Sequence, residues 1–184
     1  MQTDKIVIVD HYDSFTYNLK HWLQWHNQDK SVEIIAFDDC EAIGALLHNP
    51  CPLVLSAGPH TPQEAAPTQE LFCALRAQVP ILGICLGMQI ICAALGVSIR
   101  KSKSPLHGRR RMVQRLCATG ILADMPDTFA VAAYNSLAAS ADDVSLPAGW
   151  SVSAVSAERE IQVLEYLGNP PICGVQFHPE SFLA

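Results

Sequence analysis

The sequence is poor in charged residues. Only 16% of its 184 residues are Asp, Glu, Lys or Arg, against 49% hydrophobic residues, and the formal net charge is −6. A negative chain with few cations argues against a nucleic-acid surface, and the large hydrophobic fraction excludes a disordered chain. Basic residues are scattered, apart from Arg109, Arg110 and Arg111. We interpret these three as part of a solvated loop and expect no nucleic-acid partner.

The sequence also lacks closely spaced cysteine pairs and a stretch long enough to span a membrane. The seven cysteines include no C-x-x-C pair and no regular spacing, so we expect reduced thiols, a cytoplasmic location and no zinc site. The first thirty residues lack the apolar core of a signal peptide. The most apolar stretch, residues 81–97, is shorter than the ~20 residues that a membrane span needs, and it contains Gln89 and three glycines. We expect this stretch to lie in the protein core, and we expect the protein to have no membrane partner.

The chain does contain a repeated alternation of strand-like and helix-like segments. Residues 5–9 form a continuous apolar run, as expected for a strand covered on both faces. The alternation predicts an α/β fold, with a mostly parallel, flavodoxin-like central sheet flanked by helices, in a single domain spanning residues 1–184. The other predicted strands are residues 32–36, 53–55 and 80–84, and the predicted helices begin after Ser14, at Glu41, at Thr68 and at Leu86.

For three of these helices the sequence also predicts the cap, the apolar face or the bounds. Ser14 is the expected cap of the first, whose apolar positions are Phe15, Leu19, Trp22 and Leu23. The second, residues 41–48, places Ile43, Leu46 and Leu47 on one side, and the third covers residues 68–78.

After Gly96 the pattern changes. Residues 101–111 are basic and contain proline and glycine, so we expect a loop there. Strand-like segments then follow with few helical patterns between them, which predicts a more antiparallel C-terminal portion that shares the main sheet. These segments are residues 112–116, 129–133, 150–155, 161–167 and 172–177.

Residues 83–87, G-I-C-L-G, predict a sharp strand-to-helix turn with Cys85 at its centre. This is the G-x-nucleophile-x-G pattern, with cysteine where other enzymes carry serine. The helix that follows would direct unpaired N–H groups and its positive dipole end at the sulfur, which favours the reactive thiolate. Cys85 is therefore the candidate nucleophile, although a small buried cysteine is the common alternative. We expect Cys73 and Cys92 to be core residues of that ordinary kind.

His178, Pro179 and Glu180 end the last predicted strand. Pro179 disfavours helix at His178, and in an extended segment residues i and i+2 point to the same side. The Glu180 carboxylate can therefore orient the His178 imidazole. Such a triplet alone is weak evidence, but with Cys85 it completes a nucleophile, base and orienting group.

Polar loops follow several predicted strands and should converge. Residues 10–14, residues 56–61 and Cys85 all lie at carboxyl ends of predicted parallel strands, where ligands of such sheets bind. Asp10, His11 and Asp13 raise the alternative of a metal site. Acidic loops after a first strand are common, however, and we predict no metal.

These motifs together resemble the class I glutamine amidotransferases. The similarity is greater to the small glutaminase subunits of anthranilate synthase and aminodeoxychorismate synthase, because residues 13–18 (D-S-F-T-Y-N) are typical of that chorismate-using branch. The matching segments are residues 10–19, 55–62, 80–89, 107–108, 134–137 and 174–181, and they span nearly the whole chain.

The resemblance implies a glutaminase without a cofactor. Cys85 would attack the side-chain amide of glutamine, His178 would pass a proton to the leaving ammonia, and Glu180 would hold His178. Ammonia would pass to a larger chorismate-binding synthase subunit, with residues 13–18 and 134–136 as the docking surface. By the same resemblance, backbone N–H groups of Gly58 and Leu86 would bind the oxyanion, and the glutamine contacts would be Gly58, Pro59, His60, Gln89, Ser136 and Leu137.

The sequence departs from the family pattern at several positions. The oxyanion loop usually reads Pro-Gly-Pro-Gly, whereas here Ala57 and His60 replace its first and last residues. A positive φ at position 60 would strain a histidine. Asn135 replaces a usual histidine and cannot carry charge, and Arg109 replaces a usual lysine.

Two other functions stay open on the sequence. One is a binding subunit of the same fold that turns over little glutamine, which His60 and Asn135 favour. The other is a stand-alone cysteine hydrolase of a γ-glutamyl or amide substrate, which the docking segment at residues 13–18 opposes.

Overall fold

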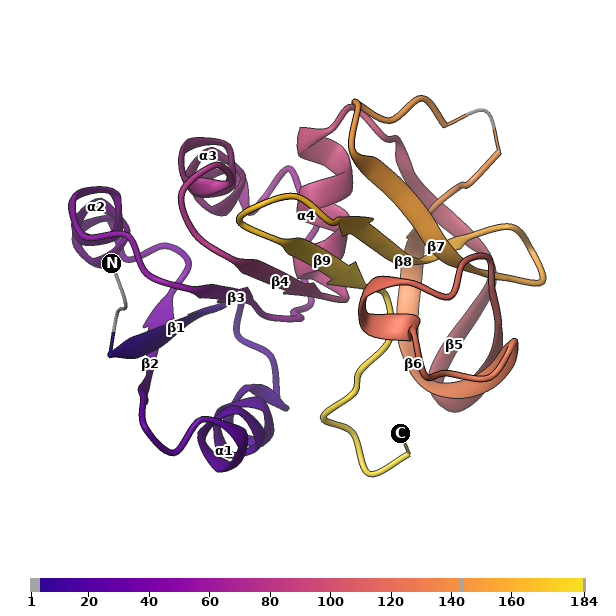
Figure 1. Cartoon of the computed structure of the whole chain (residues 1–184), viewed down its shortest axis with the longest axis horizontal. Helices are drawn as coiled ribbons and strands as arrows, with labels where there is room; N and C mark the ends of the chain where they lie inside the picture. The colour runs from indigo at the N-terminus through magenta and orange to yellow at the C-terminus, as the bar shows by residue number, and fades with distance from the viewer. Residues whose placement is uncertain (1–3, 143, 184) are drawn as a thin grey trace.

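The computed structural model describes residues 4–142 and 144–183. Its described part contains one nine-stranded sheet, four α-helices and one short 3-10 helix (Figure 1). The strands are β1 (Lys5–Asp10), β2 (Ser31–Ala36), β3 (Leu53–Leu55), β4 (Ile81–Ile84), β5 (Ile99–Arg115), β6 (Thr128–Ala139), β7 (Trp150–Ser156), β8 (Ile161–Tyr166) and β9 (Ile172–Val175). The helices are α1 (Thr16–His26), α2 (Cys40–His48), α3 (Ala66–Leu75), α4 (Leu86–Ala94) and the 3-10 helix η1 (Gly120–Leu122).

The sheet has a parallel half and an antiparallel half. Its strand order is β2-β1-β3-β4-β9-β8-β7-β5-β6. The strands from β2 to β9 pair in parallel, and those from β9 to β6 pair antiparallel. The predicted fold class is therefore confirmed, including the antiparallel portion that continues the main sheet. The last strand in sequence, β9, lies at the join and is adjacent to β4.

Helices cover both faces of the parallel half. α1 lies on one face, and α2, α3 and α4 lie on the other (Figure 1). Side chains alternate along β1, so Val7 and Val9 pack in the core under α2, α3 and α4, whereas Ile6 and Ile8 pack in the core that includes α1. This alternation specifies the register, and the parallel pairing of β1, β3 and β4 places their carboxyl ends at one edge of the sheet.

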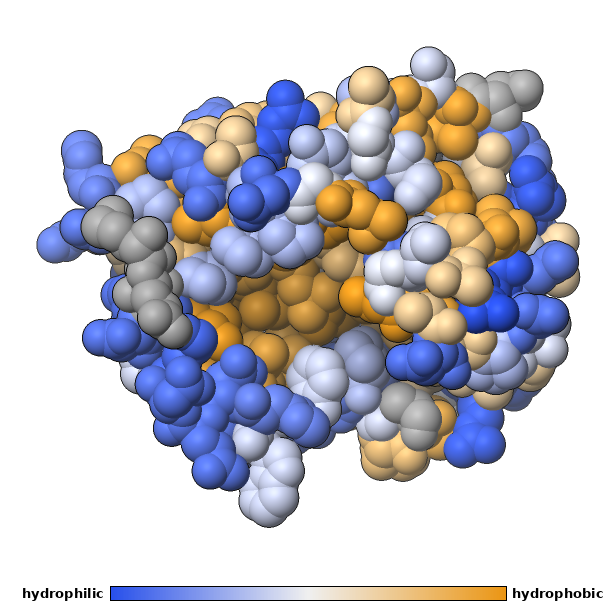
Figure 2. Space-filling view, viewed as in Figure 1, coloured by the Kyte–Doolittle hydropathy of each residue, from blue (hydrophilic) through white to orange (hydrophobic). Residues whose placement is uncertain are grey.

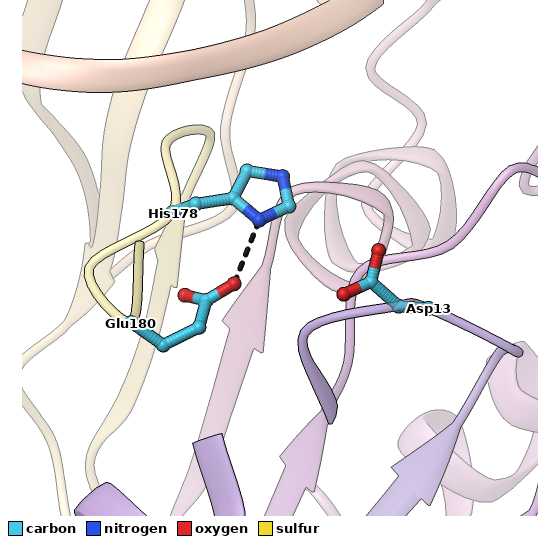
Figure 3. A group of neighbouring side chains, drawn as sticks. All are labelled: Asp13, His178 and Glu180. Carbon is cyan, nitrogen blue, oxygen red and sulfur yellow. Dashed lines mark hydrogen bonds and ion pairs between the residues drawn. The ribbon is translucent and has the colours of Figure 1, made fainter. Parts of the chain in front are cut away.

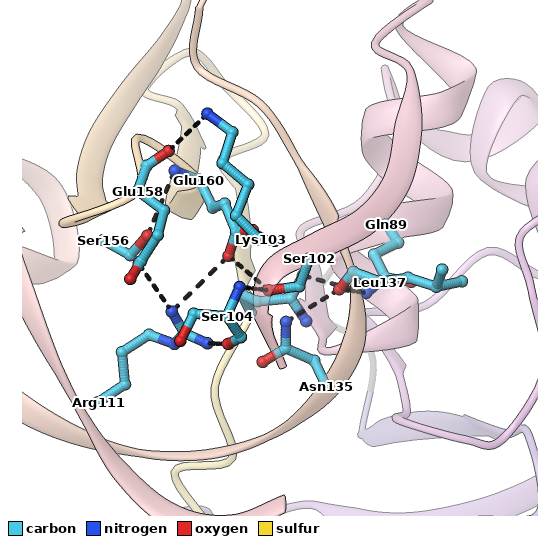
Figure 4. A network of polar contacts seen from close by, with 11 residues as sticks. Gln89, Ser102, Lys103, Ser104, Arg111, Asn135, Leu137, Ser156, Glu158 and Glu160 are labelled. Atoms are coloured by element: carbon cyan, nitrogen blue, oxygen red, sulfur yellow. Dashed lines mark hydrogen bonds and ion pairs between the residues drawn. The ribbon is translucent and has the colours of Figure 1, made fainter. Parts of the chain in front are cut away.

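The predicted loop at residues 101–111 is wrong. These residues belong to β5, which pairs with β6 apart from register shifts between Lys101 and Leu106 and between His107 and Arg109. Arg111 is buried, not solvated, because its guanidinium pairs with Glu158 at 3.1 Å and Glu160 at 3.7 Å (Figure 4). These carboxylates come from a part of the chain remote in sequence, so the local composition did not indicate the strand.

The first predicted helix is correct, but its expected cap is not. α1 begins at Thr16, and Ser14 is exposed. The loop N–H groups are accepted by carboxylates instead: Asp10 Oδ1 accepts from Tyr12 and Asp13, and Asp13 Oδ2 accepts from the N–H of Phe15 at 2.8 Å. Carboxylates at a helix start also match the positive end of its dipole.

Three side chains expected in the core are exposed. Trp22 of α1 and Leu47 of α2 lie at the edges of their apolar faces and are 40% and 46% exposed. Cys73 is also exposed, whereas Cys92 is fully buried as predicted. α3 begins earlier than predicted, at Ala66, with a proline in its first turn, where the missing N–H costs nothing.

The α1 face of the sheet is only partly covered. Figure 2 shows a hollow with an apolar floor over the β3–β4 part of the sheet. Leu82 and Cys173, which pack on the α1 side of the core, are both partly exposed. Within the described residues, no helix is long and apolar enough to cross a membrane.

Candidate active site

Cys85 occupies the turn between β4 and α4. Its backbone has φ 51° and ψ −102°, a conformation that costs a non-glycine residue free energy and is concentrated at functional sites. The turn is held by the Cys85 N–H, which donates to the Val175 carbonyl of β9 at 2.8 Å. The thiol-bearing side chain is 7% exposed. This is the strained strand-to-helix turn that the sequence predicts.

The two glycines of the turn are required for close packing. A Cβ on Gly87 would lie 2.1 Å from the Leu55 carbonyl oxygen, and a Cβ on Gly83 would lie 2.7 Å from the backbone of Gly87. Only glycine therefore allows α4 to approach β3 and β4 closely enough to present Cys85. Leu86 is the first residue of α4, so its N–H has no partner within the helix.

His178 and Glu180 form a buried pair. His178 Nδ1 and Glu180 Oε1 are 2.7 Å apart, and the side chains are 3% and 2% exposed (Figure 3). The backbone geometry differs from the prediction. β9 ends at Val175, and the Ser181 N–H donates to the His178 carbonyl at 3.2 Å, which closes a turn. The turn at Pro179, not an extended strand, brings the two side chains together.

The charge of His178 depends on its neighbours. Burial lowers the pKa of His178, but hydrogen bonds to Cys85 and Glu180 outweigh it and raise the pKa to about 10. A negative charge on either Cys85 or Glu180 stabilises the positive charge of the neighbouring imidazolium. The arrangement supports a thiolate–imidazolium pair oriented by a carboxylate.

Asp13 is a second carboxylate close to His178. Figure 3 shows that the Asp13 carboxylate and the Glu180 carboxylate lie on different sides of the His178 ring. Ligand atoms of Asp13, His178 and Glu180 lie within 4.8 Å of one another, so they could hold a metal ion. In this structure His178 Nδ1 is in its hydrogen bond to Glu180, and burial raises the pKa of Asp13. The absence of a metal stays a prediction.

His11, another residue of the metal alternative, has a structural role. Its side chain is fully buried, with Nδ1 3.1 Å from the Ser56 carbonyl oxygen and Nε2 3.0 Å from Thr68 Oγ1. A carbonyl only accepts, so Nδ1 carries the proton and Nε2 accepts from the threonine hydroxyl. Burial lowers the pKa of His11 to about 4, and the neutral ring joins the loops after β1 and β3 to α3.

A cavity of about 150 Å³ opens beside Cys85. The residues that the sequence predicts for glutamine and oxyanion binding all line it, although they come from three separate segments. Three further residues, His107, Tyr134 and Asn135, complete the wall. The lining residues are Gly58, Pro59, His60, Cys85, Leu86, Gln89, His107, Tyr134, Asn135, Ser136 and Leu137.

The unusual His60 is not strained. Among the described residues, the non-glycine positions with positive φ are Tyr12, Cys85 and Arg159, so the expected strain at position 60 is absent. The His60 ring packs against Phe37, with centroids 5.1 Å apart, and its Nε2 is buried without a hydrogen-bond partner.

Aromatic rings connect the docking segment predicted at residues 13–18 to His178. The Phe15 ring lies 5.9 Å from the His178 ring and 5.4 Å from the Tyr134 ring, and Tyr134 lies 5.0 Å from His178. Ser14, Tyr17 and nearby Asn18 are exposed. One side of this segment thus contacts the candidate base while the other faces solvent.

Sequence reasoning missed two polar contacts of the cavity. His107 Nε2 is 2.9 Å from Ser136 Oγ at the cavity wall. Gln176 Nε2 donates to Cys85 Sγ at 3.5 Å. Position 176 is two residues before His178, and that spacing was the signal that could have indicated it.

A second and larger cavity lies away from Cys85. Its volume is about 480 Å³, and it shares no lining residue with the cavity at Cys85. Its charges are mixed, since Lys103 pairs with Asp142 at 3.7 Å and donates its backbone N–H to Glu160. It therefore has no clear preference for an anion or a cation.

The fold and the site together define a class of protein. It is an α/β protein whose parallel sheet carries a buried cysteine at a strand-to-helix elbow, next to a histidine–glutamate pair from the turn that follows the adjoining strand. More particularly, the chain belongs to the class I glutamine amidotransferase family, whose family model matches residues 7–184.

Curated relatives support this assignment. Anthranilate synthase component 2 of Halobacterium salinarum is 32% identical, over 97% of this chain and 90% of that protein. The bifunctional protein TrpGD of Thermotoga maritima is 32% identical over 97% of this chain, which spans only 30% of that protein. Aminodeoxychorismate synthase of Streptomyces griseus is 37% identical over 96% of this chain, which spans 24% of its length.

A solved structure shows the same fold. The crystal structure of a glutamine amidotransferase from Thermotoga maritima has a TM-score of 0.75 with this chain, at 20% sequence identity, and the match covers 98% of this chain and 77% of that one.

Proposed function

We propose that this protein is the glutaminase subunit of a chorismate-using synthase. It would hydrolyse glutamine to glutamate and deliver the ammonia to a larger synthase subunit that makes anthranilate or 4-amino-4-deoxychorismate. The observation that carries the proposal is the buried group of Cys85, His178 and Glu180 at the edge of a cavity lined by the expected glutamine contacts.

The chemistry follows from the geometry of this group. The Cys85 thiolate attacks the side-chain amide carbon of glutamine, and the resulting oxyanion is met by backbone N–H groups of Gly58 and Leu86. His178 gives its proton to the leaving nitrogen, so that the C–N bond breaks and ammonia departs. Water then cleaves the glutamyl thioester with His178 as base, which releases glutamate. Glu180 keeps the imidazolium charged and oriented.

Gln89 is suited to the amino end of glutamine. Its Nε2 donates to the Leu137 carbonyl and to Gln176 Oε1, each at 3.0 Å. Both N–H bonds are therefore used, and the remaining Oε1 can only accept. The ammonium group of the substrate is a donor of the required kind.

The partner is supported by the names of relatives and by the exposed segment. Relatives over nearly the whole of this chain are second components of anthranilate synthase. The exposed Ser14, Tyr17 and Asn18 adjoin Phe15, which packs on His178. A subunit that docks there would contact the candidate base through one intervening ring.

Trapping with a glutamine-mimicking electrophile tests the assignment. A glutamine analogue with a reactive group at its side-chain carbonyl should modify Cys85, as located by peptide mass spectrometry, and excess glutamine should protect it. Exposed Cys73 provides the internal control. Modification of Cys73 at the same rate as Cys85, without protection by glutamine, would contradict the proposal.

A further inference from the structure

The carboxamide of Gln176 lies against the sulfur of Cys85. Gln176 is the first residue after β9 and is fully buried, and its Nε2 donates to Cys85 Sγ at 3.5 Å. Its backbone N–H donates to the Gln162 carbonyl of β8 at 2.9 Å, which holds the residue at the join between the two halves of the sheet.

A chain of hydrogen bonds fixes the direction of this carboxamide. The Leu137 carbonyl can only accept, so Gln89 must turn its NH₂ group toward it, at 3.0 Å. The same NH₂ group then donates to Gln176 Oε1, also at 3.0 Å. With its oxygen committed to Gln89, Gln176 directs its own NH₂ group at the sulfur.

Asn135 holds the far end of the chain. Its Nδ2 donates to the same Leu137 carbonyl at 2.9 Å, and the side chain is buried. Figure 4 shows Asn135 and Gln89 meeting at Leu137 from different elements, β6 and α4. Asn135 stands where the family pattern has a histidine. In this structure its side-chain amide is bound to the Leu137 carbonyl.

We propose that Gln176 stabilises the thiolate of Cys85 through this hydrogen bond, and that Gln89 and Asn135 are positioning residues that hold Gln176 in its orientation. This deepens the proposed function and rests on it, since it assigns a second donor to the same nucleophile. A hydrogen bond to a charged acceptor is stronger than one to a neutral acceptor, so the N–H group favours the thiolate over the thiol.

Other groups that face Cys85 also act on its charge. His178, in the loop after β9, interacts with Cys85 so that its pKa is raised, and Glu180 and Asp13 lie near His178. His60 and His107 line the same cavity. The test therefore leaves these groups in place and alters only neutral amides.

The test compares two buried glutamines. Gln176→Met removes the donor while keeping a side chain of similar length. Gln162→Met makes the same change on the neighbouring strand, at a glutamine that is 1% exposed and whose Nε2 has no partner among the described residues. Iodoacetamide alkylation of Cys85 is followed by peptide mass spectrometry from pH 5 to pH 10, with circular dichroism to establish that each variant is folded.

We expect Gln176→Met to raise the pH midpoint of Cys85 alkylation by about one unit, a tenfold loss of thiolate at a given pH. Gln162→Met should leave it unchanged, and Asn135→Ala should raise it by a smaller amount. Asn135→Ala lies at the cavity wall, so it keeps the test open if Gln176→Met does not fold. In glutamate release, Gln176→Met should lower kcat more than it raises KM.

Each failure has its own signature. If wild-type Cys85 alkylates only at the pH of an ordinary thiol, the proposed function itself is contradicted. If the wild type shows a low midpoint and folded Gln176→Met shares it, the role of Gln176 is overturned. If Asn135→Ala leaves the midpoint unchanged while Gln176→Met shifts it, Gln176 stands but the positioning by Asn135 does not.

Discussion

At the scale of single residues, the protonation of His178 should depend on Cys85. Hydrogen bonding to Cys85 and Glu180 raises the pKa of His178 to about 10 against the effect of burial. In Cys85→Ala the contribution of Cys85 to the raised pKa is lost while burial remains, so the imidazolium is less favoured and the pKa of His178 should fall. NMR of the imidazole in the wild type should show a charged ring at pH 8, and the variant should titrate at lower pH. An equal titration in both proteins would contradict the thiolate–imidazolium pair.

A second residue, His11, should make the fold sensitive to acid. Burial lowers its pKa from 6.5 to about 4. Between these two pH values His11 is protonated in the unfolded chain but neutral in the folded protein. The stabilisation is complete above pH 6.5 and is lost as the pH falls toward 4. This part of the unfolding free energy amounts to about 3 kcal/mol.

Urea unfolding measured between pH 7 and pH 4 tests this expectation. His11→Gln should remove that part of the pH dependence, whereas His26→Gln, a change at an exposed histidine of α1, should retain it. If both variants keep the wild-type pH dependence, the neutral buried ring is not its source.

Local spacing predicted the elbow at Cys85 and the pairing of His178 with Glu180, whereas the glutamine contacts that line the cavity were predicted only from the resemblance to the family. Glycines on both sides of Cys85 are needed by the elbow, and Pro179 constrains the turn that joins His178 to Glu180. Their catalytic roles stay predictions. The contact between Gln176 and Cys85 was not predicted. The spacing between Gln176 and His178 could place Gln176 near the candidate base, but its contact with Cys85 depends on β9 lying next to β4.

At the scale of elements, the close packing of α4 on β3 should be visible in glycine substitutions. Gly87→Ala places a methyl group 2.1 Å from the Leu55 carbonyl oxygen, so α4 must move away from the sheet. We expect a loss of roughly 1–3 kcal/mol in unfolding free energy, together with lower glutamate release because Cys85 is displaced.

Gly44→Ala is the matched control in α2, since nothing lies within 4 Å of its added methyl group. It should stabilise the protein by about 1 kcal/mol through helix propensity and leave glutamate release unchanged. Equal effects of the two substitutions would show that α4 is not packed as closely as described.

The buried ion pair beside β5 should contribute more than a surface pair. Glu160 is 4% exposed, pairs with Arg111, and accepts hydrogen bonds from Ser102 and from the Lys103 backbone. Glu160→Gln leaves Arg111 paired with Glu158 alone and weakens the hydrogen bonds that Glu160 accepts, so we expect a loss of roughly 1.5–3 kcal/mol.

Thermal and urea unfolding measure this loss. Glu33→Gln breaks the exposed pair with Lys5 and should cost below about 1 kcal/mol. A cost for Glu160→Gln no larger than that of Glu33→Gln would show that the network does not hold this part of β5.

β5 also shows where sequence patterns fail for whole elements. Short apolar runs such as β1 and β3 were predicted within a residue, because strands buried on both faces have a simple signature. β5 is rich in basic residues, and it is a strand because β6 and β7 pair with it and two distant carboxylates meet Arg111. Such long-range pairing leaves no trace in composition.

At the scale of the whole molecule, the sheet brings distant segments to one cavity. Its parallel half supplies the elbow and the loop after β3, and its antiparallel half supplies Ser136, Leu137 and His107. The exposed docking segment adjoins the same cavity through Phe15. A partner bound there would contact the candidate site through the Phe15 ring, so the proposed glutaminase should respond to the partner's presence.

Release of glutamate from glutamine tests the central claim most directly. Wild type and Cys85→Ala are each assayed alone and with a larger chorismate-binding synthase subunit. The account predicts that wild type releases glutamate, faster with the partner, and that Cys85→Ala loses at least about a thousandfold because the nucleophile is gone. Equal release by both proteins, or no release by wild type although the partner binds, would contradict it and leave a binding subunit of the same fold.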